Sequence, residues 1–169
     1  MNRTLVVALS IAIGGLALQA QPSPSAELKQ AYNRIKNNLT KAAEKMPEEQ
    51  YGFKATPDIR TFGALIAHIA DSQTRACTLV LGEPKTPTAG SKTAKADLVT
   101  ALKDSFADCD KAYDSLTDAT LTQAVKMGNR ELSKVGALAG VIAHSNEEYG
   151  YLAVYMRLKS VVPPSSEGR

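Results

Sequence analysis

Residues 24–46 read PSAELKQAYNRIKNNLTKAAEKM, and the spacing of the apolar side chains in this stretch decides the fold. A repeat of three or four positions puts such residues on one face of a helix, because an α-helix turns once every 3.6 residues. Either Ser23 or Ser25 can cap the start of this helix, and Pro47 ends it. The apolar stripe consists of Leu28, Tyr32, Ile35, Leu39, Ala42 and Met46.

Three further segments show the same helical spacing. They run from about 61 to 81, from about 95 to 116, and from a Ser133 cap to about 159. Gly82 marks the end of the second helix. No segment shows sustained two-residue alternation between hairpin turns, so the sequence predicts an all-α fold, a four-helix bundle.

The connection between the second and third helices predicts the topology. Residues 82–91 read GEPKTPTAGS, which is a loop by every local signal. A connection of about a dozen residues is longer than a tight antiparallel turn needs. At ~3.3 Å per extended residue it can run the ~30 Å length of a 20-residue helix. We therefore expect parallel second and third helices joined by a crossover, in an up-down-down-up bundle.

Length and composition restrict the class of protein. The chain has 169 residues with 44% hydrophobic and 22% charged residues, which is enough for one domain with a substantial core. A formal net charge of +3 is too small to indicate a nucleic-acid-binding face. The absence of tryptophan and the 5% aromatic content also argue against a platform for base stacking. Nucleic acid is therefore not an expected partner.

The first twenty residues have the pattern of a secretory signal peptide. Arg3 precedes an uncharged apolar run over 5–18, and polar residues resume at Gln19. We place the cleavage after Ala20, which leaves a single domain over 21–169 and a periplasmic or extracellular location. The alternative is an uncleaved membrane anchor, but the apolar run is shorter than the ~20 residues that a spanning helix needs. A stable membrane anchor is therefore not expected.

The two histidines of the chain occur in the same local setting. Both follow the tripeptide pattern Ile-Ala-His, with His68 in the second helix and His144 in the fourth. Glu148 lies one turn after His144, so these two side chains share a helix face. If the two helices face one another, the three side chains form a site for Zn²⁺, Ni²⁺ or Fe²⁺. The alternative is that the histidines are packed residues and that the His144/Glu148 spacing arises by chance.

Two segments resemble a known family. Residues 51–72, which contain His68, resemble the entry to helix two in the DinB/YfiT-like superfamily, and residues 144–165 resemble its C-terminal helix. The resemblance implies a crossover four-helix bundle and a metal-dependent hydrolase or thiol-dependent transferase. It also implies one histidine ligand from helix two and a His-x3-His pair on helix four. Here Glu148 stands where the third histidine is expected, which leaves open whether tight metal binding survives.

Three neighbouring side chains are candidates for supporting roles. Asp71 lies three residues after His68 and could orient its imidazole, although a pair with Arg75 explains it equally well. Tyr151 and Tyr155 follow Glu148 at helical spacing and either line a pocket or belong to the core.

A disulfide between Cys77 and Cys109 is expected. Export would place both thiols in an oxidising compartment, where a pair tends to be bridged. Counted from 61 and 95, the two cysteines lie at similar heights on the second and third helices if these run parallel. In an antiparallel arrangement they would lie about 15 Å apart along the axis, beyond the ~7 Å limit between Cα atoms. The alternative is two packed free thiols.

Two functions of different classes remain open at this point. The chain lacks the Cys-x-x-Cys-His, Gly-x-Ser-x-Gly and phosphate-loop motifs, which excludes a c-type haem bundle and removes the motif evidence for a serine hydrolase or nucleotide-binding protein. The first function is an exported enzyme that uses a divalent metal ion on a small-molecule substrate. The second is a non-catalytic helical bundle that serves as a binding or structural module. The sequence does not determine the oligomeric state, and a homodimer is compatible with it.

Overall fold

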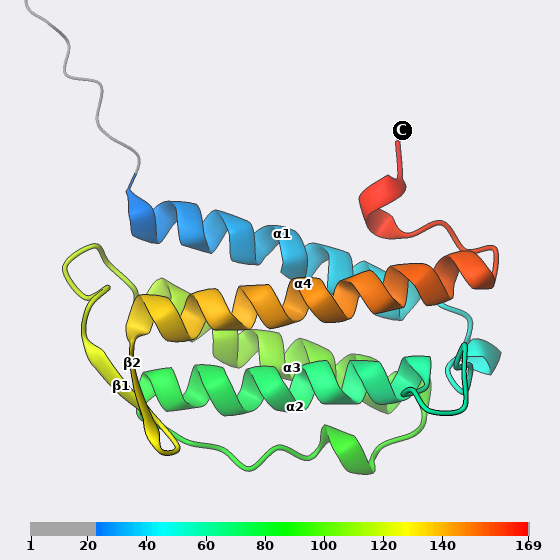
Figure 1. Cartoon of the computed structure of the whole chain (residues 1–169), viewed down its shortest axis with the longest axis horizontal. Helices are drawn as coiled ribbons and strands as arrows, with labels where there is room; N and C mark the ends of the chain where they lie inside the picture. The colour runs from blue at the N-terminus through cyan, green and yellow to red at the C-terminus, as the bar shows by residue number, and fades with distance from the viewer. Residues whose placement is uncertain (1–22, 169) are drawn as a thin grey trace, which may run out of the picture.

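Four long helices pack side by side in the computed structural model, which describes residues 23–168 (Figure 1). Three short 3-10 helices and one small hairpin connect or follow the long helices. The predicted signal peptide lies outside the described residues. The elements are α1 Pro24–Lys45, η1 Glu48–Gln50, α2 Phe62–Leu81, η2 Ala89–Ser91, α3 Lys95–Asp114, β1 Ala124–Met127, β2 Arg130–Ser133, α4 Lys134–Leu158 and η3 Pro164–Ser166.

The direction of the helices confirms the predicted topology. Figure 1 shows α1 and α4 running one way and α2 and α3 running the other. The connection between α2 and α3 travels back along the bundle and carries η2 on the way (Figure 1). The bundle is therefore up-down-down-up, and its long crossover joins two parallel helices.

Local capping explains where α1, α2 and α4 begin and where α2 ends. The hydroxyl oxygens of Ser23, Thr61 and Ser133 accept hydrogen bonds from backbone amides in the first turns of α1, α2 and α4. Each bond satisfies one of the amides that an α-helix leaves free at its start. Gly82 ends α2 with φ +76°, a left-handed conformation that glycine adopts without a steric penalty.

The small hairpin differs from the sequence prediction, which contained no strands. Strands β1 and β2 pair antiparallel, with Val125 opposite Leu132 and Met127 opposite Arg130. Each strand has only four residues, too few to show a clear two-residue alternation. Gly128 has φ +63°, which a tight two-residue connection requires. The Gly-Asn dipeptide at this turn was the signal that could have predicted it.

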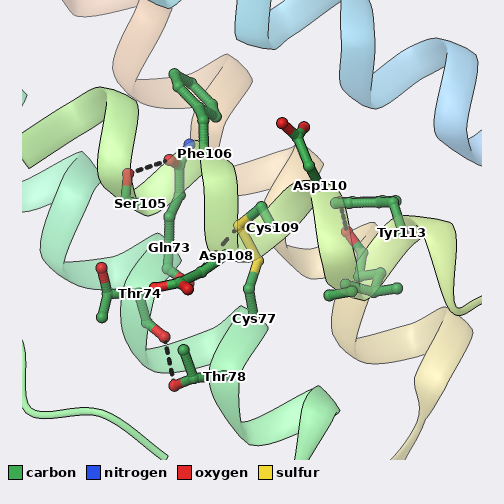
Figure 2. Close-up of a disulfide and its surroundings, with 12 residues drawn as sticks. Gln73, Thr74, Cys77, Thr78, Ser105, Phe106, Asp108, Cys109, Asp110 and Tyr113 are labelled. Carbon is green, nitrogen blue, oxygen red and sulfur yellow. Dashed lines mark hydrogen bonds between the residues drawn. A yellow bond between two sulfur atoms is a disulfide. The ribbon is translucent and has the colours of Figure 1, made fainter.

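The disulfide expected between α2 and α3 is present (Figure 2). The Cα atoms of Cys77 and Cys109 are 4.9 Å apart, and both residues are fully buried. Such a short distance requires the two cysteines to lie at the same height, as they do on parallel helices. The bridge therefore links the two helices that the crossover connects.

A buried polar network holds three helices together beside the disulfide. The Gln73 side chain on α2 donates from Nε2 to Ser145 Oγ on α4 at 3.3 Å. Its Oε1 accepts from Ser105 Oγ on α3 at 2.9 Å, as Figure 2 shows. All three residues are 1% exposed. Because buried polar groups are costly when unpaired, the network favours one relative position of the three helices.

Within residues 23–168, no helix combines the length and the apolar character that crossing a membrane requires.

Candidate metal centre

The structure brings His68, His144 and Glu148 together at the interface of α2 and α4. The Nε2 atoms of His68 and His144 are 3.1 Å apart. Glu148 Oε1 is 3.5 Å from each of them. His144 and Glu148 come from successive turns of α4, whereas His68 reaches them from α2. One ligand atom from each residue lies within 4.8 Å of the other two, an arrangement that can surround a single cation.

Glu148 is the most deeply buried member of this cluster. The residue is 5% exposed, whereas the two imidazoles are each 32% exposed. Glu148 Oε2 is buried and has no hydrogen-bond partner among the described residues. A buried carboxylate oxygen without a partner is unfavourable unless a cation, a proton or a water satisfies it. The local environment of Glu148 therefore fits a bound cation.

The surroundings of His68 favour the neutral form of its imidazole. Burial lowers the pKa of His68, and the nearby positive charge of Arg60 lowers it further. The charge of Glu148 raises the pKa of His68, but the net shift remains downward. Because only a neutral imidazole has a free lone pair for a metal, this shift favours metal binding near neutral pH.

The donor set indicates which cations would fit. Two imidazole nitrogens and one carboxylate oxygen suit Zn²⁺, Ni²⁺ and Fe²⁺. Three protein ligands leave at least one coordination position for water or substrate, as in catalytic rather than structural sites. The partial exposure of both imidazoles keeps one side of the cluster accessible to such a molecule.

Asp71 has a different role from the two that its sequence position suggested. Its Oδ1 accepts from the amide of Ala89 at 2.7 Å, and its Oδ2 accepts from the amide of Gly90 at 2.9 Å. Both oxygens therefore hold η2 of the crossover against α2, instead of bonding to His68 or Arg75. Asp71 still raises the pKa of His68 slightly through its charge.

The two tyrosines beyond Glu148 differ from one another. Tyr155 is buried, and its hydroxyl donates to the carbonyl of Arg60 at 2.9 Å. Tyr151 is 50% exposed. Both line a cleft of about 710 Å³ that also contacts Glu148 and Arg60. The sequence left open whether these tyrosines belong to the core or line a pocket. Tyr155 does both, because it is buried and also forms part of a cleft wall.

Each of the three candidate ligands also borders a cavity. The 710 Å³ cleft lies at Glu148, a second cleft of about 460 Å³ lies at His68, and a pocket of about 290 Å³ lies at His144. Arg60 lines both of the larger clefts. Each candidate ligand therefore belongs to the lining of a different cavity.

Two arginines beside this site were not predicted from the sequence. Arg60 immediately precedes the cap of α2, and Arg130 begins β2. Neither belongs to a motif, and the position of Arg130 depends on a hairpin that was not predicted. The only available signal for Arg60 was its place in the segment that leads into the helix of His68.

The fold agrees with the family that the sequence resembles. A family model described as the DinB superfamily matches residues 31–152, so the chain belongs to this superfamily. Among proteins with curated descriptions, none matches the chain.

Several solved structures share the fold at low sequence identity. A DinB-like protein from Bacillus cereus is 18% identical with a TM-score of 0.72, and the alignment covers 82% of this chain and 95% of that one. A DinB-like protein from Bacillus subtilis is 17% identical with a TM-score of 0.60, covering 79% and 92%. A mutant of a mycothiol-dependent maleylpyruvate isomerase is 16% identical with a TM-score of 0.65, covering 76% of this chain and 60% of that one.

Proposed function

We propose that this DinB-superfamily protein is an enzyme that uses a divalent metal ion to act on a small molecule, as a hydrolase or a thiol-dependent transferase. The observation that carries the proposal is the convergence of His68, His144 and Glu148, with ligand atoms within 4.8 Å of one another and a buried, unpartnered Glu148 oxygen. A divalent ion held there acts as a Lewis acid and lowers the pKa of a bound water or thiol.

The protein residues have separate tasks in this proposal. His68 and His144 would donate nitrogen lone pairs, and the lowered pKa of His68 favours its neutral imidazole. Glu148 supplies one negative charge in a buried position, which attracts the cation. A divalent cation with one carboxylate leaves a net positive charge, and Arg60 nearby adds to it. The site would therefore favour an anionic nucleophile or substrate group.

Two nucleophiles are compatible with this site. Water would make the protein a hydrolase, and a thiol would make it a transferase. The similar fold of a mycothiol-dependent isomerase supports a thiol as co-substrate. The clefts beside His68 and Glu148 have room for a small molecule next to the cluster.

Metal content is the direct test. Protein purified without chelator and incubated separately with Zn²⁺, Ni²⁺, Fe²⁺ or Mn²⁺ should retain about one ion per chain by elemental analysis. His68→Ala and His144→Ala should each abolish this stoichiometric binding. Glu147→Gln serves as the matched control, because Glu147 is an exposed carboxylate next to Glu148 and outside the cluster. If none of the four metals binds stoichiometrically, the enzyme proposal is wrong and a non-catalytic bundle is favoured.

We also propose that the protein is exported to the periplasm or the extracellular space. The apolar run over 5–18 and the polar residues after it support a cleaved signal peptide. The disulfide between Cys77 and Cys109 supports the same location, because such bonds persist in oxidising compartments.

A further inference from the structure

The inward face of the β1–β2 hairpin covers the pocket that borders His144. Met127 and Arg130 are paired across the two strands, and Leu132 lies two residues after Arg130. Paired residues and residues two apart lie on the same face of a hairpin, so these three side chains share one face. All three line the 290 Å³ pocket, opposite residues of α2 and α4. Figure 1 shows the hairpin beside the C-terminal end of α2 and the start of α4.

Small residues on the helices create the space. The helical wall of the pocket includes Ala76 on α2 and Gly136, Ala137 and Gly140 on α4. A Cβ atom added at Gly140 would have no heavy atom within 4 Å, so open space lies beside this position. Val141 adds to the apolar lining. The volume is near the lower end of the roughly 300–1,000 Å³ that is typical of small-molecule sites.

Arg130 is the charged residue on this otherwise apolar hairpin face. It is exposed at the pocket, and among residues 23–168 no carboxylate lies within ion-pair distance of its guanidinium. A guanidinium binds carboxylates and similar anions through paired hydrogen bonds. The pocket therefore has an anion-binding group in its wall and an apolar interior, with His144 also in its lining.

We propose that this pocket binds a small organic anion with an apolar body. Its anionic group would pair with Arg130, its body would contact Met127 and Leu132, and its other end would extend toward His144. Binding of such an anion in this pocket is a property separate from the proposed metal-dependent activity. Only the further step, that the bound molecule is the substrate, rests on the proposed function.

Two fluorescent probes separate the apolar and the anionic parts of this proposal. Anilinonaphthalene sulfonate is apolar and anionic, and phenylnaphthylamine is a similar apolar molecule without the charge. Each probe is titrated into folded wild-type protein and four variants, with and without chelator. Gly140→Leu fills the pocket, and Gly150→Leu is its control, since Gly150 also lies on α4 with open space but outside the pocket. Arg130→Gln removes the charge, and Lys126→Gln removes a charge from the opposite face of the hairpin.

The expected pattern differs between the variants. Gly140→Leu should abolish saturable binding of both probes, and Gly150→Leu should leave it unchanged. Arg130→Gln should weaken anilinonaphthalene sulfonate about tenfold, the loss expected for a hydrogen-bonded charge, without affecting phenylnaphthylamine. Lys126→Gln should affect neither probe.

Other outcomes would overturn the proposal. Equal binding of the anionic probe to wild type and to Arg130→Gln would overturn it. Because Arg130 is exposed, this variant still tests the proposal if Gly140→Leu fails to fold. Unchanged binding to a folded Gly140→Leu would place the probes elsewhere. Probe binding that persists with chelator supports the pocket even if no metal binds, so failure of the proposed function is distinguishable from failure of this inference.

Discussion

The Nε2 atoms of His68 and His144 lie 3.1 Å apart although 76 residues separate them in the chain. Each atom also lies 3.5 Å from Glu148 Oε1. Two protonated imidazoles at this distance would repel one another, and His144 accordingly contributes to the lowered pKa of His68. Three potential ligand atoms from two helices thus lie within 4.8 Å of one another, an arrangement that can surround a cation.

Replacing Glu148 tests whether its charge contributes to the cation site. Glu148→Gln should weaken Zn²⁺ binding by more than about tenfold, since even indirect changes around metal ligands have effects of that size. Glu148→His should preserve or tighten Zn²⁺ binding, because imidazole is a good zinc ligand. Competition with a chelating dye measures both affinities, with Glu147→Gln as the control. Equal affinities for wild type and Glu148→Gln would exclude Glu148 as a ligand.

The lowered pKa of His68 predicts a pH-dependent stability in metal-free protein. Since the pKa of His68 is lower in the folded than in the unfolded state, the unfolded chain binds more protons between the two values. The free energy of unfolding should therefore fall as the pH drops below about 6.5, the ordinary pKa of histidine. Urea denaturation between about pH 5 and pH 7 measures this dependence. His68→Gln should show a shallower slope, and identical slopes would contradict the assignment.

The disulfide should contribute substantially to stability. It joins residues 32 positions apart, and a loop of that length corresponds to about 3–4 kcal/mol in the chain-entropy description. The double variant Cys77→Ala and Cys109→Ala should lose about that much in chemical denaturation. Reduced wild type provides the comparison without a change of sequence. Two free thiols per chain in denatured, unreduced protein would show that the bond is absent.

Asp71 is expected to order the crossover between α2 and α3. Asp71→Ala removes the acceptor of the Ala89 and Gly90 amides, so these two amides should exchange with solvent faster. Hydrogen exchange followed by mass spectrometry measures the effect. Asp104→Ala changes an exposed carboxylate on α3 and should leave the exchange unchanged. Slow exchange in both variants would mean that other contacts hold the crossover.

Processing of the N-terminus tests the export proposal. Full-length protein expressed in a bacterial host should be recovered outside the cytoplasm with Gln21 as its first residue, as intact-mass measurement would show. Ile11→Arg places a charge in the apolar run and should block this processing. A secreted wild-type protein that still begins at Met1 would contradict the predicted cleavage after Ala20.

The sequence alone determined the helices and their order. Helical spacing and caps are local properties, so Ser133 and Gly82 marked their helix ends correctly. The length of the crossover indicated parallel α2 and α3, and from this the pairing of Cys77 with Cys109 followed. The His144/Glu148 pair was also accessible, because residues four apart on a helix always share a face.

Only the tertiary structure decided the contacts between segments distant in the chain. Whether His68 meets His144 depends on how α2 and α4 are rotated about their axes, and this is set by core packing and by the bonds of Gln73. The partners of Asp71 depend on the path of the crossover. The position of Arg130 depends on a hairpin whose four-residue strands are too short to predict from alternation. Local periodicity thus specified the elements, while packing between them specified the site.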